Sequence, residues 1–149
     1  MRARVVLAAV ALVLVAGVAV SWFFESRQVP GTTPASGSYR VRVTRGGREL
    51  ASFDLAALQA VGSKTVTVQG GQETGPALLD VLKRAGVSEF SALTILGAGI
   101  RDDGRLEIAV ADVGPDTVLA VAKRGTVKVA GPSIPKAKRV RDVTEIQVR

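Results

Sequence analysis

The clearest hydrophobic pattern in the chain lies between residues 69 and 87. Apolar side chains recur there at spacings of three and four, which is typical of one buried face of a helix. They are Leu78, Val81, Leu82 and Ala85. Pro76 suits the first helical position, Gly75 suits the cap before it, and Gly86 suits the left-handed residue that ends a helix. The pattern therefore predicts a main helix that begins at Pro76 and ends before Gly86.

Alternating polar and apolar residues predict strands on both sides of this helix. Residues 39–44 and 49–53 flank a glycine turn at residues 46–47 and are expected to form a hairpin. Asp54 is expected to cap a short helix over residues 55–61. The other expected strands are residues 64–69, 92–96, 105–110, 117–122, 126–130 and 144–148, with a tight turn at residues 102–104. The predicted fold class is α+β, with mixed, mostly antiparallel β-sheets and two short helices.

An uncharged segment, residues 5–24, precedes these elements. As a helix it would span about 30 Å, the thickness of the hydrocarbon core of a bilayer. Arg2 and Arg4 favour an N-terminus in the cytoplasm, and the aromatic residues 22–24 fit the outer interface. We therefore predict one N-terminal transmembrane helix that acts as a signal anchor in the cell membrane. The alternative is a signal peptide that is cleaved after Ala19.

The anchor defines the expected segments of the chain. Residues 1–4 would lie in the cytoplasm and residues 5–24 in the membrane. Residues 25–38 are rich in Pro, Gly, Ser and Thr and would form a linker. Residues 39–149 would then form a single domain outside the cytoplasm.

The composition narrows the chemistry that this chain can perform. It contains no cysteine and no histidine, which excludes disulfides, thiolate ligands and an imidazole base. The formal net charge of +7 favours anionic partners. Nucleic acid is not expected among them, because only Tyr39, Phe53 and Phe90 supply aromatic rings outside the anchor. Asp102 and Asp103 precede a glycine and fit a tight turn, so no metal site is expected there.

The segment TGPALLDVLKRAGV, preceded by a strand and a glycine-containing turn, carries a family resemblance. Together with Asp103-Gly104, Gly131-Pro132 and the closing RVRDVTEIQV, it resembles the oxidoreductase molybdopterin-binding domain of the sulfite oxidase family. The resemblance spans residues 38–148. It implies a molybdopterin cofactor whose phosphate is held by backbone amides and basic side chains.

The same resemblance implies a cysteine ligand to molybdenum, on or just after the strand before the main helix. The matching positions are Thr67, Val68 and Gln69, and none of them supplies a thiolate. We therefore expect a non-catalytic binding or accessory module of this fold rather than an enzyme. Two alternatives stay open: a molybdopterin-dependent oxidoreductase that retains the pterin without a cysteine ligand, and a β-grasp-like envelope interaction domain.

Four residues before the main helix are candidates for cofactor binding. They are Gly70, Gly71, Thr74 and Gly75. A glycine-rich turn at a helix N-terminus exposes backbone N–H groups that bind phosphate. The same glycines equally suit a turn that needs them for its shape alone.

A basic run near the C-terminus is the candidate for contact with an anionic surface. It consists of Lys136, Lys138, Arg139 and Arg141. A membrane anchor would hold these cations near anionic lipid, an envelope polymer or a redox partner protein. The alternative is a solvated loop before the last strand.

Overall fold

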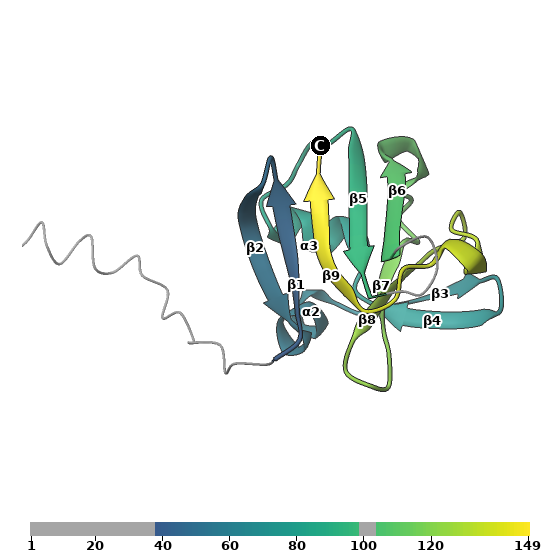
Figure 1. Ribbon diagram of the computed structural model, residues 1–149. Helices are drawn as coiled ribbons and strands as arrows, with labels where there is room; N and C mark the ends of the chain where they lie inside the picture. Colours follow the sequence, from purple (N-terminus) through teal and green to yellow (C-terminus); the bar gives the residue numbers. More distant parts are fainter. Residues whose placement is uncertain (1–37, 99–103) are drawn as a thin grey trace, which may run out of the picture. The chain divides into compact units, whose positions relative to one another are not determined.

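A five-stranded sheet forms the centre of the domain (Figure 1). The computed structural model describes residues 38–98 and 104–149. In sheet order the strands are β2 (Arg48–Asp54), β1 (Arg40–Arg45), β9 (Val143–Val148), β5 (Ala92–Gly97) and β6 (Arg105–Ala109). Neighbouring strands are antiparallel except β1 and β9, which run parallel in the middle of the sheet. The first and last strands of the described chain are therefore adjacent.

Two hairpins and two helices complete the domain. β3 (Lys64–Val68) pairs with β4 (Gly71–Gly75), and β7 (Val118–Val121) pairs with β8 (Val127–Ala130), both antiparallel. Helix α2 (Leu55–Val61) follows β2, and helix α3 (Leu78–Arg84) follows β4. Single 3-10 turns form η2 (Val110–Asp112) and η3 (Lys136–Lys138). The two hairpins come together where Ala77 bridges Val118.

The core packs the five-stranded sheet against α3. Alternation along β1 turns Val41 and Val43 inward, and both side chains are fully buried. The buried face of α3 consists of Leu78, Val81 and Leu82, which confirms the face predicted from their spacing. Full burial of each such side chain contributes roughly 1.5–3 kcal/mol to stability.

The local signals at the start of the domain are confirmed. Gly46 and Gly47 have φ values of 58° and 80°, the left-handed conformation of a two-residue hairpin turn. The Asp54 carboxylate accepts a hydrogen bond from Ala57 N at 2.8 Å and caps α2. Gly62 follows the helix with a φ of 146°. The predicted fold class, α+β with mostly antiparallel strands and two short helices, is also confirmed.

The start of the main helix differs from the prediction. Helix α3 begins at Leu78 after Ala77, and not at Pro76. Gly75, expected as the helix cap, is the last residue of β4 instead. The reason is that this stretch pairs along its whole length with β3, and cross-strand hydrogen bonding outweighs the local helix signal. The end of the helix is as predicted, because Gly86 follows it with a φ of 80°.

The predicted membrane segment, residues 5–24, lies outside the described residues, and so does most of the turn predicted at residues 102–104. Of the predicted linker, residues 25–38, the structure describes Ser38 alone. Within residues 38–98 and 104–149, no helix is both long and apolar enough to cross a membrane.

Candidate functional site

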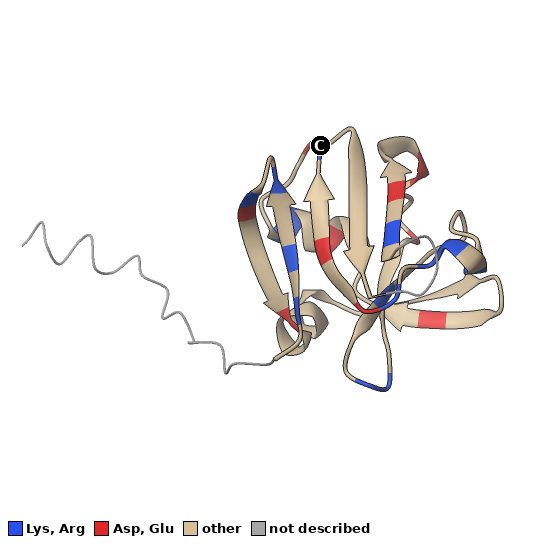
Figure 2. Ribbon diagram, viewed as in Figure 1, with Lys and Arg blue, Asp and Glu red and all other residues tan. Residues whose placement is uncertain are grey.

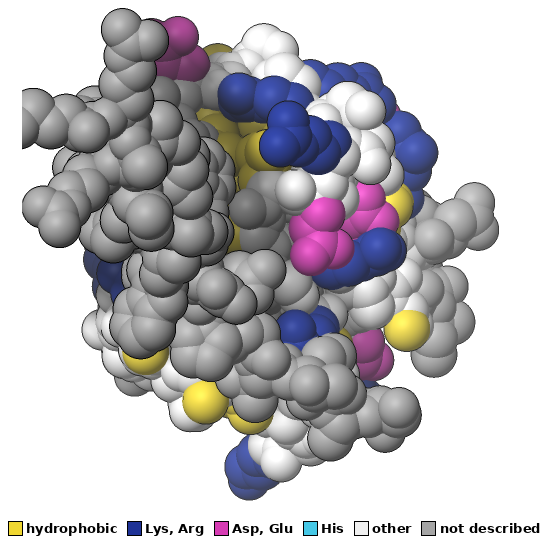
Figure 3. All heavy atoms as spheres, turned by 90° about the vertical axis from the view of Figure 1, so that its left-hand side faces the viewer, with side chains coloured by type: hydrophobic (Ala, Val, Ile, Leu, Met, Phe, Trp, Pro, Cys, Tyr) yellow, Lys and Arg dark blue, Asp and Glu magenta, His cyan; other side chains and the backbone are white. Residues whose placement is uncertain are grey.

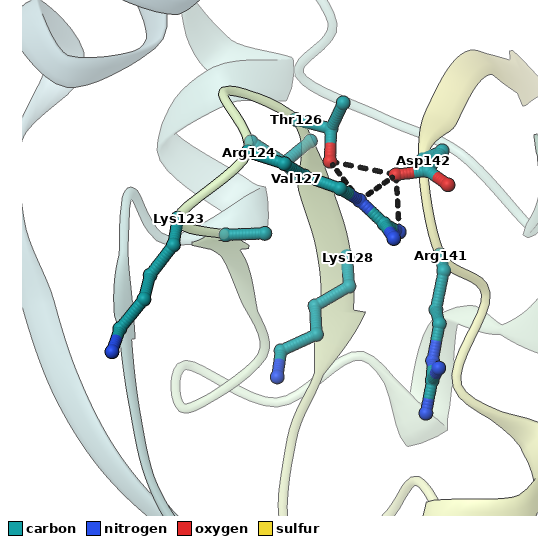
Figure 4. A pocket seen from close by; sticks show the side chains of 8 residues that line it. Lys123, Arg124, Thr126, Val127, Lys128, Arg141 and Asp142 are labelled. Carbon is teal, nitrogen blue, oxygen red and sulfur yellow. Dashed lines mark hydrogen bonds and ion pairs between the residues drawn. The ribbon is translucent and has the colours of Figure 1, made fainter.

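A hollow of about 290 Å³ lies beside the turn between β7 and β8 (Figure 4). Four cationic side chains line it: Lys123 and Arg124 from the turn, Lys128 from β8, and Arg141 from the segment that enters β9. Thr126 and Asp142 complete its polar lining. We call this site the cationic hollow.

The β7–β8 turn presents two of these cations because of its local sequence. Ala122 N donates to Thr126 O at 2.8 Å and closes the loop. Gly125 N donates to Ala122 O at 3.0 Å, and Gly125 has a φ of 79°, a left-handed conformation that a glycine adopts without strain. Lys123 and Arg124 therefore project from a short, hydrogen-bonded loop, whose basic positions are coloured blue in Figure 2.

Asp142 joins this turn to the start of β9. Its Oδ1 atom accepts hydrogen bonds from Thr126 Oγ1 at 2.6 Å and from Arg124 Nη2 and Nε at 2.6 and 2.9 Å (Figure 4). The Thr126 hydrogen bond, followed by the hydrogen bond and charge of Arg124, lowers the pKa of Asp142. The carboxylate is consequently ionised at neutral pH and holds the Arg124 guanidinium in one orientation.

Tyr39 connects the same region to β1. Its hydroxyl accepts a hydrogen bond from Val127 N at 3.1 Å and donates one to the carbonyl oxygen of Val143. Burial is the main cause that raises the pKa of the Tyr39 phenol. The neutral hydroxyl thus links the beginning of β8, which carries Lys128, to the beginning of β9, which follows Arg141.

Glu73 on β4 lies between two cations. Its Oε1 atom is 2.7 Å from Lys128 Nζ and 3.8 Å from Arg139 Nη1. Arg139 Nη2 also donates to the carbonyl oxygen of Gln69 at 2.7 Å, and the Arg139 side chain is only 7% exposed. These contacts fasten the β3–β4 hairpin to the basic segment before β9.

The four basic residues that the sequence singled out have different surroundings. Lys136 and Lys138 are exposed on η3, Arg139 is directed toward the β3–β4 hairpin, and Arg141 lines the cationic hollow. Sequence reasoning missed the cations at positions 123, 124 and 128, which join Arg141 only in the folded chain. Their signal is a charge asymmetry, since residues 117–142 contain seven Lys or Arg and a single acidic residue.

The side of the domain formed by β1 and β2 has a different character (Figure 3). Some blue and magenta side chains lie next to one another there, and further blue side chains have no magenta neighbour. Arg42 Nη2, for example, is 3.2 Å from Glu145 Oε2, and Thr44 Oγ1 donates to the same carboxylate at 2.8 Å. Neighbouring opposite charges largely cancel at a distance. The Arg42 charge is therefore partly balanced by Glu145.

The four residues predicted to bind a cofactor lie at opposite ends of one hairpin. Gly70 and Gly71 are at the β3–β4 turn, whereas Thr74 and Gly75 are at the far end of β4. Thr74 and Gly75 line a second hollow, of about 240 Å³. The four residues do not form a single turn in front of α3, because residues 71–75 form the extended strand β4, which holds Gly70 and Gly71 apart from Thr74 and Gly75.

The positions that match the family's molybdenum ligand carry no soft donor. Thr67 and Gln69 are exposed and Val68 is buried. The Gln69 side-chain oxygen accepts a hydrogen bond from Lys136 N at 3.3 Å. Within the two described ranges, no group of three or more acidic, His or Cys residues is placed to hold a metal ion. A hydroxyl, a hydrocarbon and an amide do not replace a thiolate, so these residues do not fit molybdenum.

The sequence matches no protein-family model. It also matches no curated protein sequence. Among solved structures, the domain is similar to the sulfane dehydrogenase SoxCD from Paracoccus pantotrophus, with a TM-score of 0.59 and 18% sequence identity. The similarity covers 74% of this chain and 38% of that chain. The domain therefore has a fold that is distantly like that of a molybdopterin oxidoreductase.

The sheet order bears on the β-grasp alternative as well. The first and last strands of the described chain, β1 and β9, are parallel neighbours, β2 pairs with β1, and α3 packs against the sheet. This strand order leaves the β-grasp alternative a hypothesis.

Proposed function

We propose that the chain is a non-catalytic binding module, anchored in the membrane through residues 5–24, that presents a cationic surface to an anionic partner outside the cytoplasm. The observation that supports this most directly is the convergence of Lys123, Arg124, Lys128 and Arg141 on one hollow. Sequence segments as far apart as the β7–β8 turn and the start of β9 contribute to it. If the basic segment before β9 were only a solvated loop, nothing would require Arg141 to lie beside the cations of the β7–β8 turn.

Anionic lipid is the partner that this arrangement favours. Each basic residue near an anionic membrane surface contributes about 1 kcal/mol of attraction. Lys136 and Lys138 of η3 add to the exposed cations of the hollow. An anchor followed by a linker at residues 25–38 would keep these cations within reach of lipid head groups. An anionic envelope polymer or an acidic redox partner would be attracted by the same charges.

We propose a non-catalytic role because the chain lacks the side chains that would bind a catalytic metal. The chain has no cysteine and no histidine, and the positions that match the metal ligand offer no soft anion. The second candidate function is a molybdopterin-dependent oxidoreductase. The observation that favours it is the structural similarity to a sulfane dehydrogenase. Such an enzyme would have to retain the pterin without a protein thiolate.

Lysine footprinting on the full chain tests the binding surface. The chain is placed in nanodiscs of phosphatidylglycerol or of phosphatidylcholine, and acylation of each lysine is quantified by mass spectrometry. We expect Lys123, Lys136 and Lys138 to be protected in the anionic nanodiscs at low salt and to become reactive at high salt. Lys83, exposed on α3, is the internal control. Equal reactivity of the three lysines in both lipids would contradict the proposal.

The anchor is tested separately by cell fractionation and intact mass spectrometry. We expect the chain in the membrane fraction to retain its N-terminal residues and its domain to be cleaved by an external protease. A mature form that starts at Val20 in the soluble fraction would instead establish a cleaved signal peptide.

A further inference from the structure

We propose that the cationic hollow is a discrete site for one tetrahedral oxyanion, a phosphate or sulfate group. The inference rests on the proposed function and deepens it, because it replaces a diffuse attraction between charges by a built site. The group recognised is the oxyanion itself, whether it is free or part of a lipid head group.

The geometry of the cations is the first argument. In Figure 4 the side chains of Lys123, Lys128 and Arg141 extend in the same direction from different parts of the backbone. They come from the β7–β8 turn, from β8 and from the entry to β9. All three side chains line the one hollow, so a single anion bound there would lie in the positive field of all of them.

The held position of Arg124 is the second argument. It uses two of its five N–H groups, Nε–H and one Nη2–H, to bond Asp142. Asp142 in turn accepts from the Thr126 hydroxyl at 2.6 Å. The remaining guanidinium N–H groups are thereby fixed before a ligand arrives, which reduces the entropy lost on binding. A guanidinium suits tetrahedral oxyanions because its planar fork can donate two parallel hydrogen bonds.

The surrounding carboxylates do not cancel the cations. Lys128 is paired with Glu73 at 2.7 Å, and Glu73 also faces Arg139. Asp142 is engaged by Arg124 and Thr126. Lys123 and Arg141 have no acidic partner among the described residues. The four cations of the hollow thus meet two carboxylates, Glu73 at Lys128 and Asp142 at Arg124, which leaves the charges of Lys123 and Arg141 unbalanced.

The lining of the hollow limits the ligand class. Its volume of about 290 Å³ accommodates a phosphate or sulfate group with room to spare, so the chemistry of the lining selects the ligand. Among the described residues, no aromatic side chain lines it, so this lining offers no surface on which a base or a sugar ring would stack. The site therefore fits a small, strongly hydrogen-bonding anion.

The experiment is a calorimetric titration of the full chain in micelles of an uncharged detergent. Inorganic phosphate and sulfate are compared with chloride at constant ionic strength. We expect saturable binding of one phosphate or sulfate per chain and no saturable binding of chloride. Arg141→Gln removes a charged hydrogen-bond donor and should raise the Kd roughly tenfold. Arg84→Gln is the matched control, since Arg84 is an exposed arginine on α3 and does not line the hollow; its Kd should stay within about twofold.

Two results would overturn the site. One is the absence of saturable oxyanion binding, and the other is an equal effect of Arg141→Gln and Arg84→Gln. If either occurred while lysine footprinting still showed protection on phosphatidylglycerol, the proposed binding module would stand and the discrete site would not. Competition by inorganic phosphate for the protection of Lys123 would identify a head-group phosphate as the occupant. Saturable binding without such competition would identify a free oxyanion.

Discussion

Gly75 on β4 lies directly against the backbone of Leu119 on β7. A Cβ atom at Gly75 would overlap the Leu119 carbonyl group and come within 2.9 Å of the Cα atom of Ala120. The contact continues at the next residue, where the Pro76 carbonyl oxygen accepts from Leu119 N at 2.9 Å. The glycine is thus required by the close approach of two hairpins, and not by a left-handed φ.

This contact predicts that Gly75→Ala destabilises the domain. The added methyl group has only backbone to displace, so the hairpins must separate, at a cost of about 1–3 kcal/mol or more. Gly114→Ala is the control, because a Cβ there would meet nothing closer than 4.0 Å, and it should change stability by roughly 0.5 kcal/mol or less. Urea unfolding of both variants, as full chains in micelles, measures the difference. Equal midpoints would mean that the hairpins are not in close contact.

A second prediction concerns the two faces of α3. Leu82 is 1% exposed and belongs to the core, whereas Lys83 is exposed. Leu82→Ala should lower the free energy of unfolding by about 2–5 kcal/mol through lost burial and the cavity left behind. Lys83→Ala should stay within roughly 0.5 kcal/mol of the parent. Thermal unfolding followed by circular dichroism distinguishes the two, and similar losses would show that the buried face is misassigned.

A third prediction follows from the lowered pKa of Asp142. A carboxyl group whose pKa falls on folding stabilises the folded state above its unfolded pKa, about 3.8. That contribution is lost as the pH falls through the lower folded pKa. Asp142→Asn keeps the side-chain shape and tolerates the left-handed φ of 51°. The variant should therefore be less stable than the parent at neutral pH, and the gap should close below the folded pKa.

Denaturant unfolding across this pH range provides the measurement. Glu89→Gln is the comparison, because Glu89 is exposed, lies outside the helices and strands, and forms no ion pair with a described residue. It should follow the parent across the whole range. A difference between Asp142→Asn and the parent that persists unchanged below the folded pKa would refute an electrostatic role for this carboxylate.

A fourth prediction is that the purified chain neither oxidises sulfite nor reduces a sulfoxide. Thr67, Val68 and Gln69 give molybdenum no thiolate, and no cysteine elsewhere in the chain replaces it. Reconstitution with the molybdenum cofactor, followed by metal quantitation and a dye-coupled assay, tests this. Stoichiometric molybdenum with steady turnover would establish the alternative function. Thr67→Cys measures whether a thiolate at this exposed position is sufficient for metal retention.

The sequence determined those elements whose signals are local. The left-handed glycines at 46 and 47 set the first hairpin, Asp54 caps α2 through a side chain three residues before Ala57, and Gly86 ends α3. Period-two and period-four patterns depend on neighbours in the chain, so they identified the buried faces of β1 and α3 correctly. The missing cysteine and histidine are equally a property of the sequence alone.

The tertiary structure decided what depends on contacts between distant residues. The sequence predicts a turn before the helix at Gly70 to Gly75, but residues 71–75 pair with β3 and form the strand β4. The close approach of the Leu119 backbone then requires a glycine at position 75. The sequence predicts a single basic patch before β9, but Arg139 contacts Glu73 and the Gln69 carbonyl oxygen and is nearly buried. The cationic hollow itself brings Arg141 beside a turn that lies fifteen or more residues earlier in the chain. Sequence periodicity does not encode such pairings, because the partner that selects each conformation lies in another strand or another hairpin.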